Sequence, residues 1–276
     1  PENKRNFDRF GEWVTADELK LYGDKDLDHQ GKSAGHVIND LATNMLGFAA
    51  EYTGDGPNLY RAIQLYMGGG KLESFYTDNA PAYEYAAKKL ECLNPESMPY
   101  DPKSNSIIER KNGLVIDGTR CNLLQAGVGP IMWSTAALHW CVAWNVTRKN
   151  EKLASTQEDN AEAKTPYEKK FGEPFAGMLV PYGALVYYHP HQPDLKKMPK
   201  FAERARPGIF TGWGLLPGYK WDKCYTVADL HSFQEGKRTP INMEVKTYQI
   251  VVPSGPFQFP LRDAAEKNLL DISKSG

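Results

Sequence analysis

Apolar and polar positions divide the first half of the chain into strand-like and helix-like stretches. Four stretches carry the alternation or the short apolar run of a β-strand, and they are residues 13–21, 33–38, 45–52 and 72–77. The second and third are joined by the turn 39–44, as in a hairpin. Between the third and fourth strands, apolar side chains recur at helical spacing over residues 59–67, and Gly68-Gly69-Gly70 ends that helix.

Three further helices are predicted after the fourth strand. The first has Ala82, Ala86 and Leu90 on one face, and we expect Asn79 to cap it with Pro81 in its first turn. The second carries Glu109 and starts at a cap supplied by Ser104 or Asn105, although Gly113 and Gly118 weaken it. The third, residues 131–147, is apolar enough to be largely buried. The order β-β-β-α-β-α-α-α predicts an α/β fold, a mixed sheet flanked by helices.

The pattern changes after residue 150. Residues 151–164 are polar and are interpreted as a linker, and residues 165–172 form a short capped helix that closes on glycine. Short β-type runs separated by turns then predict a small all-β barrel, and these runs are residues 185–188, 208–213, 224–230 and 243–252. Residues 261–276 are a polar tail, interpreted as a single helix.

Composition limits the class of protein only broadly. The net charge of −1 and pI of about 6.7 do not by themselves indicate a nucleic-acid-binding protein, so that function would depend on local basic patches. The cysteines Cys92, Cys121, Cys141 and Cys224 form no CxxC pair, which favours a reduced, intracellular protein over a disulfide scaffold or a zinc site. There is no secretory signal, and the longest apolar stretch, residues 131–146, is interrupted and too short to span a bilayer, so no membrane is expected as a partner. A start at Pro1 fits a fragment of a longer chain.

Three acids are candidates for one site. Asp78 follows the fourth strand, Glu109 lies on a later helix, and Asp17 lies within the first strand. Carboxylates at a strand end and on a helix can meet at one point, and a third would allow metal-assisted attack on phosphodiester bonds. The simpler interpretations are that Asp78-Asn79 caps a helix and that Glu109 is solvated. Asp40 is interpreted as a hairpin-turn acid.

Several motifs occur together in one order along the chain. They are Thr77-Asp78-Asn79; Pro99-Tyr100-Asp101-Pro102-Lys103-Ser104-Asn105; Glu109-Arg110-Lys111-Asn112; Arg120; residues 133–145; Thr165-Pro166-Tyr167-Glu168 with Phe171-Gly172; Tyr182-Gly183; and residues 208–213. In this order they resemble the integrases of retroelements, most closely those of copia-type retrotransposons. The resemblance covers roughly residues 13–230.

The resemblance implies an RNase H-like catalytic core with a D,D,E triad. It places the triad on Asp17, Asp78 and Glu109, which would bind Mg²⁺ or Mn²⁺, with Asp17 bridging two ions. The implied activity is 3′-end processing and strand transfer of DNA. The implied domains are a core at residues 1–172, an SH3-like barrel at 173–260 and a tail at 261–276, and the supporting residues are Asn79, Asn105 and Asn112.

The chain departs from the family pattern in three places. Ala80 and Ser106 stand where the family has glycine, and the interval from Asp78 to Glu109 is shorter than in most relatives. The zinc-binding His-His-Cys-Cys module is not present in this stretch of chain. Two alternatives therefore remain: a degenerate or domesticated relative that binds DNA or protein without catalysis, and an RNase H-like nuclease that only hydrolyses.

Basic residues supply candidate contacts to double-stranded DNA, which would be sequence-independent and salt-sensitive. They are Lys103, Arg110, Lys111, Arg120, Lys196, Lys197, Lys200, Arg204 and Arg206. For Arg110 and Arg120, structural ion pairs are the alternative. Joining two DNA ends implies a homo-oligomer, and the family implies a location in the nucleus.

Other motifs do not support a function. Gly68-Gly69-Gly70-Lys71 lacks the following Ser or Thr of a P-loop and lies after a helix rather than before one. His189 and His191 have no further ligands spaced to complete a metal site. The tryptophans of residues 133–144 are expected to pack in the core.

Overall fold

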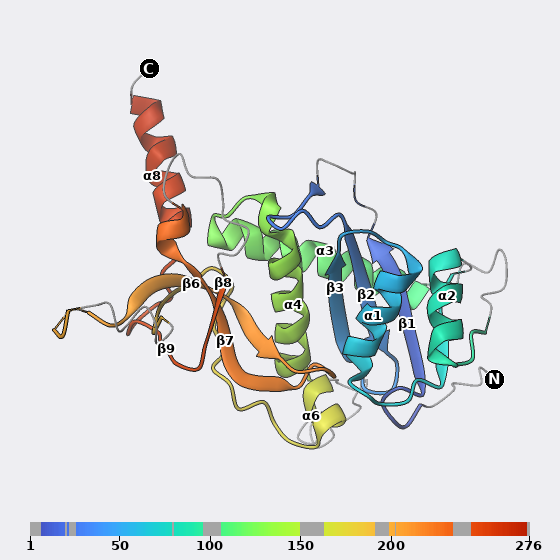
Figure 1. The fold of residues 1–276 in the computed structure, drawn as a ribbon. Coiled ribbons are helices and arrows are strands. Elements are labelled where there is room, and N and C mark those ends of the chain that lie inside the picture. The colour runs from blue at the N-terminus through green and yellow to red at the C-terminus, as the bar shows by residue number, and fades with distance from the viewer. Residues whose placement is uncertain are drawn as a thin grey trace.

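The computed structural model describes most of the chain as two β-sheets with one helix, α4, between them (Figure 1). The described residues are 7–19, 21, 26–78, 80–95, 106–149, 163–190, 199–201, 203–233 and 244–274, with side chains described as far as residue 267.

The first sheet has four strands in the order β3-β2-β1-β4. These strands are β1 (Trp13–Leu19), β2 (Ala34–Asp40), β3 (Leu46–Glu51) and β4 (Ser74–Tyr76). The first three form an antiparallel meander, whereas β4 lies parallel to β1. The predicted mixed sheet is therefore confirmed, and the return of the chain to β4 brings two distant segments to the same end of the sheet.

Two helices cover one face of this sheet. Helix α1 (Gly56–Met67) is capped by the Asp55 side chain and ends at Gly68, whose φ of 63° is readily adopted by glycine. Helix α2 (Pro81–Leu90) begins after Ala80, which makes no side-chain capping bond. The prediction that Asn79 caps α2 is thus wrong: proline at the first helical position holds the residue before it, Ala80, in the extended cap conformation.

Two longer helices cover the opposite face. They are α3 (Ser106–Ala126) and α4 (Trp133–Thr147), separated by the 3₁₀ turn η2 (Pro130–Met132). Ile108 and Val115 of α3 pack with Val37 and Phe48 of the sheet and with Cys141 of α4. This apolar layer fixes α3 across the strands, so that residues on its first turns lie near the end of β1.

The second sheet is antiparallel, with the strand order β8-β7-β6-β5-β9. Its strands are β5 (Leu185–Tyr188), β6 (Arg206–Leu215), β7 (Trp221–Asp229), β8 (Glu244–Thr247) and β9 (Ile250–Val251). Short helix α6 (Pro166–Phe171) precedes it, capped and closed by Gly172 as predicted, and the cap is a capping box formed by Thr165 and Glu168. The described pairings do not join β8 to β9, so the antiparallel β-module is confirmed and closure into an SH3-like barrel stays a prediction.

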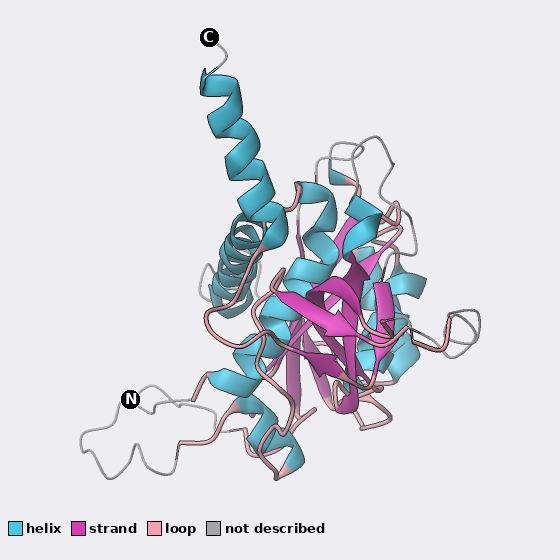
Figure 2. Cartoon of the chain, turned by 90° about the vertical axis from the view of Figure 1, so that its left-hand side faces the viewer, coloured by secondary structure: helices cyan, strands magenta, loops and turns pink. Residues whose placement is uncertain are grey.

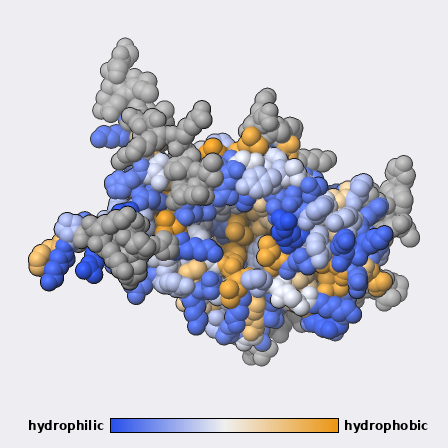
Figure 3. All heavy atoms as spheres, in the orientation of Figure 1, coloured by the Kyte–Doolittle hydropathy of each residue, from blue (hydrophilic) through white to orange (hydrophobic). Residues whose placement is uncertain are grey.

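Helix α4 belongs to the cores of both sheets. Ala137 and Cys141 pack toward the first sheet, whereas Val142 packs with Phe210 and Val227 of the second. Figure 3 shows apolar colour gathered on this face between the two sheets, where α4 lies. A helix that is apolar all round requires partners on both sides, which explains why the two sheets share it.

The tail is helical, as predicted. Helix α8 (Pro260–Lys274) begins against α3, where the Arg262 backbone lies beside Gly127. It then points away from the rest of the chain (Figure 2).

Two glycines of α3 give opposite expectations for substitution by alanine. A Cβ at Gly118 would overlap the indole ring of Trp140, whereas a Cβ at Gly113 would meet no atom within 4 Å. We expect Gly118→Ala to lower the free energy of unfolding by about 2 kcal/mol, and Gly113→Ala to raise it by about 0.5–1 kcal/mol through helix propensity. Urea denaturation of both variants measures this, and an equal effect of the two would contradict the packing of α3 on α4.

Candidate functional site

Asp17 lies within β1, and Asp78 follows the end of β4, the neighbouring parallel strand. Trp13 pairs with Ser74 and Thr15 with Tyr76, so each acid lies two residues beyond the last pair of this register. Asn112 of α3 contacts Asp17, which places that side chain on the face of the sheet that α3 covers. Asp78 Oδ1 accepts a bond from the Ala80 backbone N–H at 3.4 Å, at the start of α2.

A third carboxylate, Glu18, lies close enough to Asp17 and Asp78 for their charges to affect its pKa. Burial raises the pKa of Glu18, and the charges of Asp17 and Asp78 raise it further. Burial likewise raises the pKa of Tyr83 on α2, and the charges of Asp17, Asp78 and Glu18 raise it further. Both shifts have one physical cause beyond burial: negative charge is concentrated at this end of the sheet.

Helix α3 approaches the pair through Asn112. The Asn112 amide Nδ2 donates to Asp17 Oδ2 at 2.7 Å, and the Glu18 backbone N–H donates to Asp17 Oδ1 at 2.9 Å. Glu109 lies three residues before Asn112, so it occupies the same helix face one turn nearer the start of α3. Its side chain is exposed.

Asp17 and Asp78 both act on the charge of Glu18, and the triad of Asp17, Asp78 and Glu109 stays a prediction. Within the described ranges, no group of three His, Cys, Asp or Glu side chains has an arrangement that could hold a metal ion. Glu109 is thus positioned on the correct helix face without lying in a ligand cluster with Asp17 and Asp78.

The donor set nevertheless fits a hard divalent cation. Asp17 and Asp78 supply carboxylate oxygens, the ligand type that Mg²⁺ prefers, and their charges are concentrated enough to raise the pKa of Glu18. Asn112 Oδ1, which belongs to the amide that donates to Asp17, is buried and has no hydrogen-bond partner among the described residues. Oxygen atoms in this state are suited to bind water or a cation at the carboxylates.

The predicted DNA-binding residues on α3 have different surroundings. Arg110 is exposed and its Nε donates to the Ser106 carbonyl of its own helix, while Arg120 pairs with Asp117 at 3.2 Å on the surface. Lys111 is half-buried: its Nζ donates to Asn44 Oδ1 at 2.6 Å and lies 4.8 Å from the Trp144 ring. Burial lowers the pKa of Lys111 to about 8. Lys111 thus has a packing role that the motif did not predict.

The remaining predicted contacts lie on the segment that leads into β6. Lys200 and Arg204 are exposed, and Arg206 opens the strand opposite Tyr188. Lys103, Lys196, Lys197, Asn79 and Asn105 lie outside the described residues. The predicted basic residues that the structure describes therefore fall into two groups, one on α3 and one at the start of β6 and just before it.

Sequence reasoning missed Glu18 and Tyr83. Glu18 was passed over because it follows Asp17 directly and its side chain leaves the strand on the opposite face. Tyr83 resembles any other apolar position of an amphipathic helix, and only the packing of α2 places its hydroxyl near the acids. The adjacent pair Asp17-Glu18 within a strand was the one signal available.

Comparisons with known proteins gave matches only among solved structures. No protein-family profile matches the chain, and no curated protein matches it. Among solved structures, the chain is similar to the catalytic core domain of BIV integrase (TM-score 0.41, 15% identity), over 57% of this chain and 92% of that one. It is also similar to a chain of the simian T-cell lymphotropic virus intasome in complex with PP2A regulatory subunit B56 gamma (TM-score 0.47, 14% identity), over 90% and 82%.

A third structure is the HTLV-2 integrase catalytic core domain in complex with magnesium, in a trimeric form. It has a TM-score of 0.44 and 15% identity, over 59% of this chain and 98% of that one. Similarity at this level says nothing of what the chain binds or does. Separately, none of the helices in the described part of the chain has the length and apolarity needed to cross a membrane.

Proposed function

We propose that this chain is a retroelement integrase of copia type, with an RNase H-like core over residues 1–172 and an SH3-like module over 173–260. Its reaction is metal-dependent processing of DNA ends and their transfer into target DNA. It acts as a homo-oligomer in the nucleus, because two DNA ends must be joined to one target. The motif order along the chain supports the family, and the geometry of the acids supports the chemistry.

The observation that carries the proposal is the position of Asp17 on β1 and of Asp78 just after the parallel neighbour β4, with Asn112 of α3 bonded to Asp17. These residues come from three segments that are far apart in the sequence. A helix cap at Asp78 alone would require neither the matching acid on β1 nor the amide from α3. The convergence therefore favours a site over a set of unrelated surface acids.

The chemistry follows from the charge of the reacting groups. Cleavage and transfer of a phosphodiester build negative charge on the attacking and leaving oxygens, and Mg²⁺ or Mn²⁺, when bound, supplies the stabilisation of that charge. Asp17, Asp78 and Glu109 would hold the ions, with Glu109 reaching the pair from the first turn of α3. Asn112 fixes the orientation of the Asp17 carboxylate through its 2.7 Å bond.

Plasmid DNA tests the proposal without knowledge of the DNA-end sequence. With Mn²⁺ or Mg²⁺ we expect nicking of supercoiled plasmid and covalent joining of a labelled oligonucleotide to it, and with Ca²⁺ or EDTA neither product. Nicking without joined strands, under conditions that support joining by a known integrase, would identify a nuclease that only hydrolyses. Binding of DNA with no metal-dependent product would contradict the proposal that the chain is an enzyme.

A non-catalytic relative is the second candidate function. It is favoured by the position of Glu109, which does not join a three-residue cluster among the described residues, and by Ala80 in place of glycine. Salt-dependent DNA binding without metal-dependent cleavage is the outcome that it predicts.

A further inference from the structure

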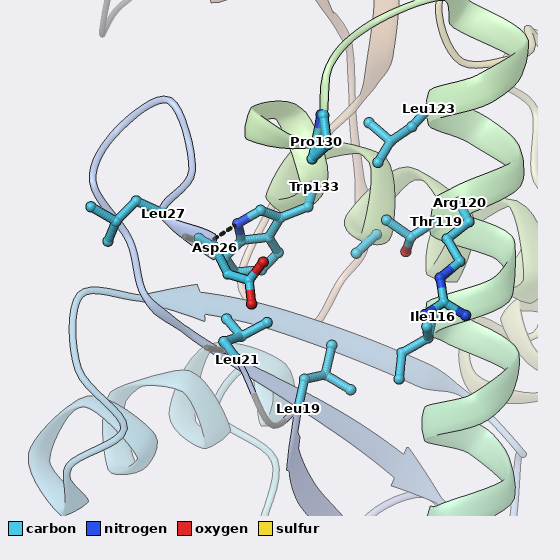
Figure 4. Close-up of a pocket in the computed structure, with 11 residues that line it drawn as sticks. Leu19, Leu21, Asp26, Leu27, Ile116, Thr119, Arg120, Leu123, Pro130 and Trp133 are labelled. Atoms are coloured by element: carbon cyan, nitrogen blue, oxygen red, sulfur yellow. Dashed lines mark hydrogen bonds between the residues drawn. The ribbon is translucent and has the colours of Figure 1, made fainter. Parts of the chain in front are cut away.

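A pocket of about 160 Å³ lies between α3, the start of α4 and the segment that follows β1 (Figure 4). Its walls are largely apolar: Leu19 and Leu21 form one side, Ile116 and Leu123 of α3 form another, and Trp133 covers a third. The Trp133 indole is held in place because its Nε1 donates to the Asp26 carbonyl at 2.8 Å. An apolar cavity of about 150 Å³ is large enough for a benzene ring, so the pocket admits a planar ring.

The rim of the pocket carries charge of both signs on opposite sides. The Arg120 guanidinium lies on the α3 side, and the Asp26 carboxylate on the other (Figure 4). Arg120 is largely exposed and pairs with Asp117 through Nη1 alone, and arginine has five N–H donors. Donors thus remain for an anion, and the bidentate geometry of arginine suits a phosphate.

The pocket adjoins the acidic pair. Leu19 lies two residues beyond Asp17 on the same face of β1, a distance of about 7 Å along a strand. Ile116 lies one turn beyond Asn112 on α3, about 6 Å along a helix. A DNA strand with a phosphate at Asp17 would therefore bring a neighbouring nucleotide to this pocket.

We propose that the pocket binds one nucleotide of that strand, with the base in the apolar cavity and the phosphate at Arg120. The placement of the strand rests on the proposed function. The match of ligand to pocket rests on its own chemistry: a flat ring for the cavity and an anion for Arg120. A fully apolar ligand would make no use of the remaining N–H donors of Arg120.

Mononucleotides test this without any catalytic reaction. Ligand-observed NMR and the indole N–H resonance of Trp133 measure binding of dAMP, deoxyadenosine and 2-deoxyribose 5-phosphate to the metal-free protein. We expect dAMP to bind about tenfold more tightly than deoxyadenosine, and Arg120→Gln to remove that difference. The sugar phosphate, which lacks a base, should bind at least tenfold more weakly than dAMP.

Two variants complete the test. Arg61→Gln removes an exposed arginine of α1, away from the pocket, and should leave dAMP binding unchanged. Ile116→Phe should fill the cavity and weaken dAMP binding about tenfold; if it unfolds, Leu27→Phe at the exposed edge serves the same purpose.

Two outcomes would contradict the proposal that the pocket binds a nucleotide. Sugar phosphate binding equal to that of dAMP would leave only a surface anion site at Arg120. Indole binding as tightly as dAMP, with no effect of Arg120→Gln, would leave a general apolar cavity. Neither outcome affects plasmid nicking, and failure of nicking does not affect mononucleotide binding, so the two proposals fail separately.

Discussion

Asp78→Asn is expected to abolish metal-dependent nicking and joining of plasmid DNA, with a rate loss of about 1,000-fold or more. The substitution keeps the size of the side chain and its bond to the Ala80 backbone while removing one charge from the Asp17–Asp78 pair. A few kcal/mol of lost charge stabilisation corresponds to this factor, since each tenfold in rate costs about 1.4 kcal/mol. Asp17→Asn and Glu109→Gln should have effects of similar size.

The melting temperature shows whether a loss of activity in Asp78→Asn comes from the missing carboxylate or from a damaged fold. Burial and then the charges of Asp17 and Asp78 raise the pKa of Glu18, so Asp78→Asn should leave the melting temperature in EDTA unchanged or slightly higher. Asp263→Asn, which alters an exposed acid of α8, is the matched control and should keep full activity. Nicking by Asp78→Asn at the wild-type rate would remove Asp78 from the site.

Lys170→Met is expected to lower the free energy of unfolding by about 2 kcal/mol and the melting temperature by about 5 °C. Lys170 Nζ donates to the Gly218 carbonyl at 2.6 Å and to the Tyr66 carbonyl at 3.3 Å. It also lies 3.4 Å from the centre of the Phe10 ring and faces the buried carboxylate of Asp40. One amine thus ties α6 to α1 and to the β6–β7 turn of the second sheet.

Thermal unfolding of Lys170→Met beside Lys88→Met, an exposed lysine of α2, measures the effect. Asp40→Asn and the double variant complete a cycle, in which the two single effects should not add because the charges are coupled. Equal melting temperatures for the Lys170 and Lys88 variants would show that the second sheet does not depend on this contact.

The same lysine gives stability a defined pH dependence. Burial lowers the pKa of Lys170 to about 7, and the charge of Asp40 acts in the opposite direction. In the unfolded chain a lysine has a pKa of about 10.4, so between about pH 7 and pH 10 the unfolded state binds more protons. The contribution of Lys170 to stability therefore rises with pH across this window.

Comparing the free energies of unfolding of wild type and Lys170→Met isolates the contribution of Lys170. Tyr66 and Tyr219, which also face this region, have raised pKa values and stay neutral, whereas Lys111 titrates in the same direction. The difference in free energy of unfolding between wild type and Lys170→Met should therefore grow from pH 7 to pH 9. A constant difference would contradict the lowered pKa.

Much of the fold could be predicted because local patterns dominate it. Alternation identified all four strands of the first sheet, and the ends of α1 and α6 followed from glycines whose left-handed conformation few other residues adopt readily. Asp40 proved to be a turn acid, as predicted, with Oδ1 accepting from Thr43. The predicted cap of α2 was wrong because Pro81 is the first helical residue, which makes Ala80 the N-cap.

In the candidate site, too, some features could be predicted from the sequence and others depend on tertiary contacts. Asp17 and Asp78 were predicted from a strand pattern and a motif, which are local features of the sequence. The bond from Asn112 to Asp17 joins residues that are far apart in the chain, and the role of Lys111 depends on Asn44 and Trp144. No local pattern encodes such contacts.

The sequence by itself determined most of the strands and helices, and from it the three acids were predicted. The tertiary structure alone decided that Asn112 bonds to Asp17, how α4 is shared by two sheets, and that Lys170 of α6 contacts both α1 and the β6–β7 turn. The physical reason is that periodicity reports only which side of an element is buried. What lies against that side is set by packing between segments distant in sequence, and from that packing come the crowding of charge at Asp17 and the lowered pKa of Lys170.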